Sequence, residues 1–387
     1  MATPLNQTTI KKENKQLVLH YIRKHEPVSR ARIAQMTGLN KGTISTLVAE
    51  LIEEELLTEI GTGKSSGGRK PVLLQVNKHA GYSIGIDIGV QHILGTLTDL
   101  GSNQLVTERK PLKETSFFYV VNEVLSMIRY LTRHIPESAY GLIGIGVGVP
   151  AIVSIHGEII HAPNLKWRHV DLKKELRKCN VPIWIDNEAN YGALGQHLTE
   201  QTTKIDTTLY ISAGIGIGAG LLLNGELYKG THGFAGEVGH MTMDVNGPIC
   251  RCGNYGCWEL FASEQALLSY TGSEQTLEEL ITLARNGDAA TLDAFRNVAT
   301  YLGKGIVSLI HIFSPDQIII GNRLAMASDF LYEEMNKTIS SRLVTDQQHT
   351  PISFSTLHND ATALGATSFS IDQFFQDDTA HKKAHST

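Results

Sequence analysis

The sequence contains few cysteines and no long apolar run. Of its 387 residues only 4 are cysteine and 3 are tryptophan. A chain of this length with so few cysteines does not rely on a disulfide framework. It has no stretch of about 18 consecutive apolar residues, which argues against a membrane-spanning helix. Because the first residues also lack the apolar core of a secretion signal, we expect a cytoplasmic protein.

Net charge is also low, at −5, but it is unevenly distributed. Residues 1–80 carry 12 Lys and Arg against 7 Asp and Glu, whereas the remainder carries 22 against 32. A basic N-terminal part on an acidic body indicates that the N-terminal part alone binds nucleic acid. The length suggests two or three domains. The 36 glycines and 42% hydrophobic residues are typical of a soluble α/β protein with many tight turns.

The first 53 residues have the pattern of a helix-turn-helix. One face of a first helix is apolar, with Leu17, Val18, Tyr21 and Ile22. Pro27 ends this helix, Ser29 is placed to cap a second, short helix, and Gly38 ends that one. A third helix follows at once and begins with small polar side chains, as recognition helices do. The alternative is a three-helix packing module with no DNA-binding role.

The next residues predict a β-wing, in which two strand-like stretches flank a Gly- and Ser-rich basic tip. An arginine at such a tip can enter the minor groove, where the negative potential is enhanced. The helices and the wing together predict that the following residues contact DNA: Ser29, Arg30, Asn40, Lys41, Thr43, Ser45, Thr46, Lys64, Arg69 and Lys70.

Beyond residue 78 strand-rich blocks alternate with helical stretches, which predicts an α/β class. Gly-rich turns recur in both halves of this part. We therefore expect two related lobes around a cleft, the usual place for a small ligand.

Three of the four cysteines fall within eight residues, at Cys250, Cys252 and Cys257. With His240 upstream they offer three thiolates and one imidazole, a closed tetrahedral set that suits structural zinc. Gly253 and Gly256 allow sharp turns between the ligands. The alternative is three buried cysteines and an unrelated histidine, and redox sensing is a weaker possibility.

A family resemblance rests on seven motifs in a fixed order, namely GIDIG, GVGVPA, APNLKW, DNEAN, GIGIGAG, GEVGH and CRCGNYGCWE. They resemble the ROK family, which groups bacterial repressors, open reading frames and sugar kinases. The resemblance implies a two-lobed actin-like ATPase (sugar-kinase-like) fold. It predicts a winged helix-turn-helix domain at residues 1–78 and a sugar-binding and dimerisation domain at residues 79–387. Within the family, head and body are most similar to the repressors that respond to xylose.

The resemblance also implies a sugar site. Asn187, Glu237, His240 and Glu259 match the family's sugar ligands directly. Glu188 stands where the kinases have a catalytic Asp, and Asn164 belongs to a loop that lies beside the sugar in the family. Such carboxylates, amides and imidazoles can pair with vicinal hydroxyl groups. His240 would bind zinc through one nitrogen and face the sugar with the other side of its ring, and the metal would stiffen the wall of the site.

Three positions depart from the kinase pattern. The first phosphate loop reads Asp87–Ile88–Gly89–Val90–Gln91, without the family's second Gly and Thr, and the second reads Gly214–Ile215–Gly216 in place of Gly-Thr-Gly. The catalytic Asp is replaced by the longer Glu188. Since a misplacement of about 1 Å can cost roughly a hundredfold in rate, we expect no enzymatic activity.

These departures favour a sugar-responsive repressor. We expect a homodimer that binds double-stranded operator DNA of xylose-utilisation genes and releases it on binding D-xylose. Glucose and N-acetylglucosamine remain competing effectors. Two further alternatives are an active sugar kinase with a DNA-binding head, and a DNA-binding protein whose body only dimerises.

Overall fold

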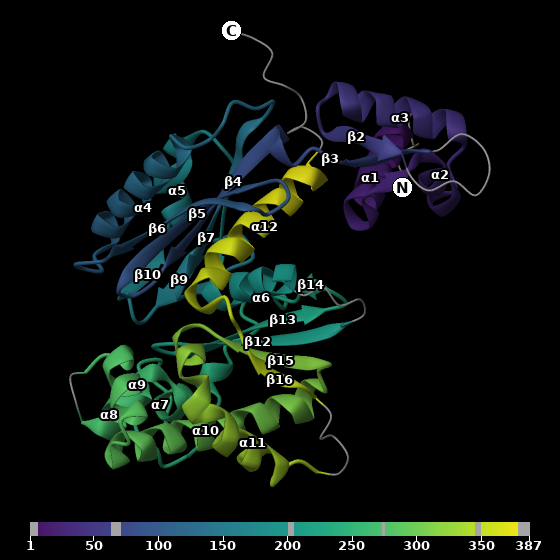
Figure 1. Cartoon of the computed structure of the whole chain (residues 1–387). Helices are drawn as coiled ribbons and strands as arrows, with labels where there is room; N and C mark the ends of the chain where they lie inside the picture. Colours follow the sequence, from purple (N-terminus) through teal and green to yellow (C-terminus); the bar gives the residue numbers. More distant parts are fainter. Residues whose placement is uncertain (1–6, 63–70, 200–204, 273–274, 345–349, 378–387) are drawn as a thin grey trace.

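The computed structural model describes residues 7–62, 71–199, 205–272, 275–344 and 350–377, which form a small N-terminal head and a two-lobed body (Figure 1). The wing-tip residues Lys64, Arg69 and Lys70 lie outside the described residues. In the described part of the chain, no helix is long and apolar enough to cross a membrane.

The head is a winged helix-turn-helix, as predicted. Its elements are α1 (Gln7–His25), β1 (Val28–Ser29), α2 (Arg30–Thr37), α3 (Lys41–Glu53), β2 (Leu57–Thr62) and β3 (Val72–Val76). The strands form a sheet in the order β1-β3-β2. Side-chain oxygens cap both helices of the motif, since Ser29 accepts from the Arg32 amide and Asn40 from the Thr43 amide. Between them Gly38 ends α2 with a φ of 73°.

One detail of the first helix was predicted wrongly. Leu17 is 44% exposed, whereas Val18 and Ile22 are buried together with Leu19. The apolar face of α1 is therefore rotated by part of a turn from the predicted one. The reason is tertiary, because this face packs on both the other head helices and a helix of the body.

The first lobe is built on a five-stranded sheet. Its strands are β4 (Gly81–Ile88), β5 (His92–Asp99), β6 (Gln104–Pro111), β7 (Gly141–Val149) and β11 (Ile183–Asn187). They lie in the order β11-β7-β4-β5-β6. Helix α4 (Phe117–Thr132) packs through its apolar face into the core of this lobe. A smaller sheet of β8 (Ile152–Val153), β9 (Ile159–Ala162) and β10 (Trp167–Val170) adjoins it, and α5 (Leu172–Leu176) precedes β11.

The second lobe repeats this arrangement. Its strands are β12 (Thr207–Ala213), β13 (Ile217–Leu223), β14 (Glu226–Leu227), β15 (Gln317–Gly321) and β16 (Ile352–Phe354), in the order β14-β13-β12-β15-β16. Its helices are α7 (Glu259–Ala262), α8 (Glu264–Thr271), α9 (Leu277–Arg285), α10 (Ala289–Phe313) and α11 (Ser328–Ser340). In both lobes the first strand pairs antiparallel with the second and parallel with the fourth, so the lobes share one topology.

Two helices, α6 (Glu188–Thr199) and α12 (Ala361–Gln376), lie between the two sheets (Figure 1). They approach closely because of two glycines. A Cβ on Gly195 would lie 1.9 Å from the Ala361 carbonyl oxygen, and one on Gly365 would lie 1.7 Å from that of Tyr191. Any larger residue would push the two helices apart.

Helix α12 then runs on to the head (Figure 1). Its last turns place Ile371, Phe374 and Phe375 in the same apolar cluster as the core of the head. Arg23 of α1 pairs with Asp372 at 2.7 Å and lies over the ring of Phe375 at 4.1 Å. The C-terminal helix therefore contacts both lobes and the head.

Candidate functional site

A cavity of about 120 Å³ opens between the two lobes. Pockets for drug-sized ligands occupy about 300–1,000 Å³, so this one suits a smaller molecule. All six residues predicted to bind sugar line it, namely Asn164, Asn187, Glu188, Glu237, His240 and Glu259. They come from positions up to 95 residues apart in the chain, and the fold gathers them in one place.

Asn187 and Glu188 mark the point where β11 ends and α6 begins. The carboxyl end of a parallel strand is a common position for ligand-binding groups. The Asn187 amide is already engaged by the protein. It donates to the Ala151 carbonyl at 2.9 Å and accepts from the Ala189 amide at 2.7 Å. These two bonds fix its orientation toward the cavity.

Glu188 is fixed from two sides. Ser212 of β12 donates to its carboxylate at 3.4 Å, and Thr362 of α12 donates to its backbone oxygen at 3.2 Å. Removal from water raises the pKa of Glu188 to about 8, and the nearby carboxylate of Asp87 adds to the shift. At neutral pH Glu188 is therefore mainly protonated and can donate a hydrogen bond as well as accept one.

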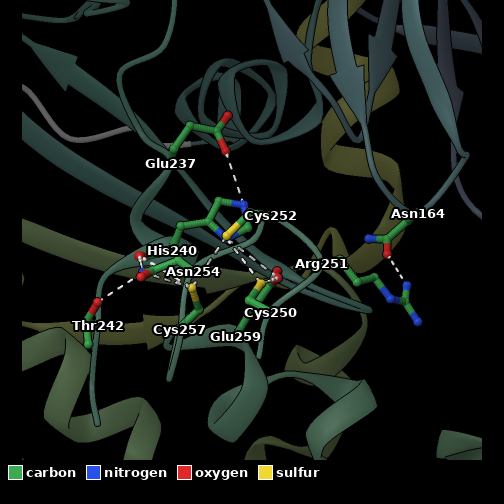
Figure 2. A network of polar contacts seen from close by, with 10 residues as sticks. All are labelled: Asn164, Glu237, His240, Thr242, Cys250, Arg251, Cys252, Asn254, Cys257 and Glu259. Carbon is green, nitrogen blue, oxygen red and sulfur yellow. Dashed lines mark hydrogen bonds and ion pairs between the residues drawn. The ribbon is translucent and has the colours of Figure 1, made fainter. Parts of the chain in front are cut away.

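Glu237, His240 and Glu259 form one group on the wall of the second lobe (Figure 2). His240 Nε2 lies 3.9 Å from Glu237, and Nδ1 lies 3.6 Å from Glu259. Burial, and secondly the charge of Glu259, raise the pKa of Glu237 to about 7. The group thus offers hydrogen-bond donors and acceptors side by side, which vicinal hydroxyl groups require.

The predicted metal ligands also come together. One ligand atom from each of His240, Cys250, Cys252 and Cys257 lies within 4.8 Å of the other three. Two bridges between short segments, Thr242 with Cys257 and Ile249 with Tyr255, shape this loop. Gly253 and Gly256 adopt φ values of 94° and 60°, as the sharp turns between the ligands require.

The geometry of this group fits a tetrahedral ion. The Cys252 and Cys257 sulfurs are 3.7 Å apart, and the Cys250 sulfur is 3.8 Å from His240 Nδ1. Tetrahedral zinc with bonds of about 2.3 Å to sulfur would hold two sulfurs roughly 3.8 Å apart. Burial raises the pKa of the Cys250 and Cys257 thiols, so a metal must displace their protons to bind.

Several residues that line the cavity were not predicted as ligands. Asp87 and His92 flank the turn between β4 and β5, with 3.6 Å between His92 Nε2 and the carboxylate. Asn322 follows β15 and donates to Ser212 at 2.9 Å. Arg251 stands between two of the cysteines and reaches across the cavity. The position of Arg251 between Cys250 and Cys252 was the available sequence signal for it.

In the head, the described DNA-binding candidates share one segment. Asn40, Lys41, Ser45 and Thr46 are exposed at the start of α3, and Thr43 is partly exposed. Three of their polar groups already bond to the helix backbone, because Asn40 caps it and the Ser45 and Thr46 hydroxyls donate to carbonyls one turn back.

The two remaining candidates lie at the start of α2. Ser29 caps that helix, and Arg30 pairs with Glu59 of β2 at 2.8 Å. Both are therefore engaged within the head.

Comparison with known protein families decides what kind of chain this is. A family model described as the ROK family matches residues 83–373, which is most of the chain. The chain belongs to the ROK family. A second model, the MarR family, matches residues 17–64, which include the helix-turn-helix. The predicted family and fold class are both confirmed.

Relatives within the ROK family cover almost the full length. The chain is 42% identical over 374 residues to the xylose repressor of Bacillus subtilis (strain 168), with 95% of this chain and 97% of that protein covered. It is 26% identical over 354 residues to the DNA-binding transcriptional dual regulator NagC of Escherichia coli (strain K12), with 87% of each covered.

Solved ROK structures show the same architecture. A ROK family transcriptional regulator, described as a homologue of the E. coli MLC protein, has a TM-score of 0.81 at 26% identity and covers 97% of this chain and 98% of its own. A ROK family glucokinase from Streptomyces griseus in complex with glucose and AMPPNP has a TM-score of 0.69 at 25% identity. It covers 74% of this chain and 98% of its own.

Proposed function

We propose that this ROK protein is a transcriptional repressor that releases operator DNA of xylose-utilisation genes when D-xylose binds between its lobes. The observation that carries the proposal is the combination of a winged helix-turn-helix head with six polar side chains around one small cavity. Xylose as the effector is supported by the 42% identical relative that is named a xylose repressor. N-acetylglucosamine and glucose are the competing effectors.

We assign sugar binding to Asn164, Asn187, Glu188, Glu237, His240 and Glu259. Carboxyl groups with raised pKa values suit a neutral, hydroxyl-rich ligand because protonated acids donate and ionised acids accept hydrogen bonds. An anionic sugar phosphate would meet the carboxylates of Asp87 and Glu259 in the same cavity.

We further propose that the four-residue metal site holds a structural zinc ion. His240, Cys250, Cys252 and Cys257 fill all four tetrahedral positions, so no position is open for catalysis. Zinc would hold the His240 ring and, through the same loop, Glu259 in place at the cavity wall. Its role in the proposal is therefore to shape the sugar site.

Sugar phosphorylation is not part of the proposal. A kinase needs Gly-rich loops around the nucleotide phosphates. Here the His92 ring packs against Gly89, within 2.6 Å of where a Cβ would lie, and the Asn322 amide lies 3.0 Å from the corresponding position on Gly214. Side chains of this protein thus occupy space beside both loops. Sugar binding without nucleotide is supported by the departure of both loops from the kinase pattern, at Val90 and Gln91 in the first and Ile215 in the second.

The head would bind DNA as one half of a dimer. We propose that α3 lies in the major groove, with its exposed N-terminal residues at base edges and phosphates. Two heads in a homodimer would contact half-sites about 34–36 Å apart or a multiple of that spacing. By linkage, a sugar that weakens operator binding must itself bind less tightly to the operator-bound protein.

The test is fluorescence anisotropy of a labelled DNA fragment from upstream of neighbouring sugar genes. Salt is held fixed because affinity depends steeply on it, and D-xylose, glucose and N-acetylglucosamine are each titrated without ATP. We expect release by D-xylose alone. Tight DNA binding with no response to any of the three would reject the effector, and phosphorylation of an aldose by ATP would favour the kinase.

Glu259→Gln serves as the site variant in the same experiment. It should leave operator affinity unchanged and weaken the sugar response by about tenfold or more, since it removes a charged hydrogen-bond acceptor from a partly buried site. Glu158→Gln, an exposed position outside the cavity, is the matched control. A normal response of Glu259→Gln would remove this residue from the site.

A further inference from the structure

A side-chain contact between Arg251 and Asn164 joins the two lobes across the cavity. Arg251 Nη1 donates to the Asn164 side-chain oxygen at 2.6 Å (Figure 2). Asn164 lies in the loop between β9 and β10 of the first lobe. Arg251 lies in the second lobe, in the segment of residues 240–257 that carries the candidate metal ligands and is called the metal-binding loop here. Both residues line the cavity, and the Arg251 side chain is exposed to solvent. The contact therefore lies at the mouth of the cleft.

Two other polar links between the lobes have a different position. The Ile155 amide donates to the His232 carbonyl at 3.3 Å, and Lys229 forms an ion pair with Asp186. None of these four residues lines the cavity. Ser212 of the second lobe also bonds Glu188 of the first at 3.4 Å, but of these two residues Glu188 alone lines the cavity. In the bond between Arg251 and Asn164 both residues line it. Both residues also line a second hollow, together with Val90, Gln91, Ile215, Glu264, Gln265 and Leu268.

Candidate metal ligands flank the arginine on both sides, and a zinc ion bound by them would hold it in place. Cys250 and Cys252 are its chain neighbours, and the Cys250 amide is bonded to the Asn254 carbonyl at 2.7 Å. A loop fixed at both neighbours has little freedom, so the arginine loses little backbone entropy when it reaches across. Asn164 is the corresponding fixed point on the first lobe, in a loop that ends at the buried Trp167.

We propose that Arg251 and Asn164 form a latch over the mouth of the cleft, which controls how fast the sugar enters and leaves. The inference rests on the proposed sugar-binding function and deepens it. A contact that must break at every passage slows association and dissociation together and leaves the affinity nearly unchanged. A residue that bonds the sugar directly behaves differently, because its loss mainly raises the dissociation rate and the Kd.

The test is stopped-flow tryptophan fluorescence of the full chain with D-xylose, since Trp167 and Trp258 lie close in sequence to Asn164 and Glu259. In Arg251→Ala both rate constants should rise by roughly three- to tenfold, as suits one exposed hydrogen bond, with Kd changed by less than about twofold. In an Asn164→Ala background the arginine substitution should leave the association rate unchanged. Arg251→Lys should give intermediate rates.

Arg168→Ala is the matched control, an exposed arginine on β10 of the first lobe. Metal content and thermal unfolding of each variant establish that it is folded. Unchanged rates in Arg251→Ala overturn the latch, and so does a higher dissociation rate with an unaltered association rate. Failure of the wild-type protein to bind D-xylose, glucose and N-acetylglucosamine would instead overturn the proposed function, and the latch with it.

Discussion

At the scale of single residues, the surroundings of Glu188 disfavour the ionised form of its carboxyl group. Removal from water and the neighbouring Asp87 carboxylate raise its pKa to about 8, while Ser212 donates a hydrogen bond that partly favours the charged form. In the unfolded chain a glutamate ionises near pH 4.3. The folded protein therefore holds a proton at neutral pH that the unfolded chain has released.

The raised pKa of Glu188 makes the free energy of unfolding depend on pH in a defined direction. A raised folded-state pKa contributes stability below the unfolded pKa, and that contribution is lost as the pH rises through the folded value near 8. Glu188→Gln cannot ionise. Between pH 6 and pH 9 the free energy of unfolding of the wild type should therefore fall by about 2–3 kcal/mol more than that of Glu188→Gln. The slope is about 1.4 kcal/mol per pH unit below the folded-state pKa.

Urea denaturation of both proteins at several pH values measures this difference. Glu158→Gln, an exposed substitution, should follow the wild-type curve. Parallel curves for Glu188→Gln and the wild type would show that Glu188 ionises normally.

The sequence predicted the identity of the residues that line the cavity better than it predicted the contacts that their side chains make. All six proposed sugar ligands do line it, and each belongs to a motif on which the family resemblance was based. Arg251 was missed as a lining residue because its reach to Asn164 depends on the distance between lobes, which no local pattern encodes. The roles assigned to these side chains remain predictions.

At the scale of elements, the loop that carries the candidate metal ligands is a segment whose shape the proposed zinc ion would fix. Its tip is exposed, with Val245 and Ile249 at 78% and 65%, whereas Cys250 and Cys257 are buried. Burial at the exposed tip offsets little of the cost of ordering the chain, so the proposed zinc ion would add to local stability there. The loop also supplies Glu259 and His240 to the wall of the cavity.

Removal of the metal should therefore weaken sugar binding and leave operator binding intact. We expect a loss of roughly ten- to a hundredfold in sugar affinity, the usual cost of disturbing the groups around a metal site. Isothermal titration after dialysis against a chelator measures the affinity, and elemental analysis measures zinc. Because buried thiols must lose protons to bind, the metal should be lost more readily as the pH falls.

Re-addition of zinc should restore the sugar affinity, which separates metal loss from irreversible damage. A metal-free protein that binds D-xylose with full affinity would contradict the shaping role of the loop.

Element boundaries in the head could be predicted because their signals are local. Ser29 and Gly38 mark the two ends of α2 by their own side-chain and backbone preferences. The exposed Leu17 could not be predicted, since an apolar residue at helical spacing looks the same whichever neighbour the helix meets. That neighbour includes α12, which follows more than 330 residues later.

At the scale of the whole molecule, α12 is the element that touches every part. At its start Thr362 bonds the backbone of Glu188 beside the cavity, and at its end Asp372 and Phe375 hold Arg23 of the head. A helix of 16 residues is about 24 Å long, so it links the two sites through one rigid body. This makes it a candidate route by which lobe movement reaches the head.

Arg23→Ala should uncouple the head from the body. It removes an ion pair and a cation–π contact, so we expect a modest loss of stability of about 1 kcal/mol. Operator affinity without sugar should be nearly unchanged, while the factor by which D-xylose weakens it should fall several-fold. Anisotropy titrations with and without sugar measure that factor.

Lys24→Ala changes the next residue of α1, which is exposed, and should behave as the wild type. An unchanged coupling factor in Arg23→Ala would mean that the signal does not pass through this contact.

All four metal ligands fall within residues 240–257 of the second lobe, at a distance from the head (Figure 1). On the proposed function, loss of the zinc ion would impair the sugar site between the lobes and leave DNA binding by the head intact. A bacterium starved of zinc would then keep these genes silent even in the presence of their sugar. Trace-metal supply would thus decide whether the carbon source can be used at all.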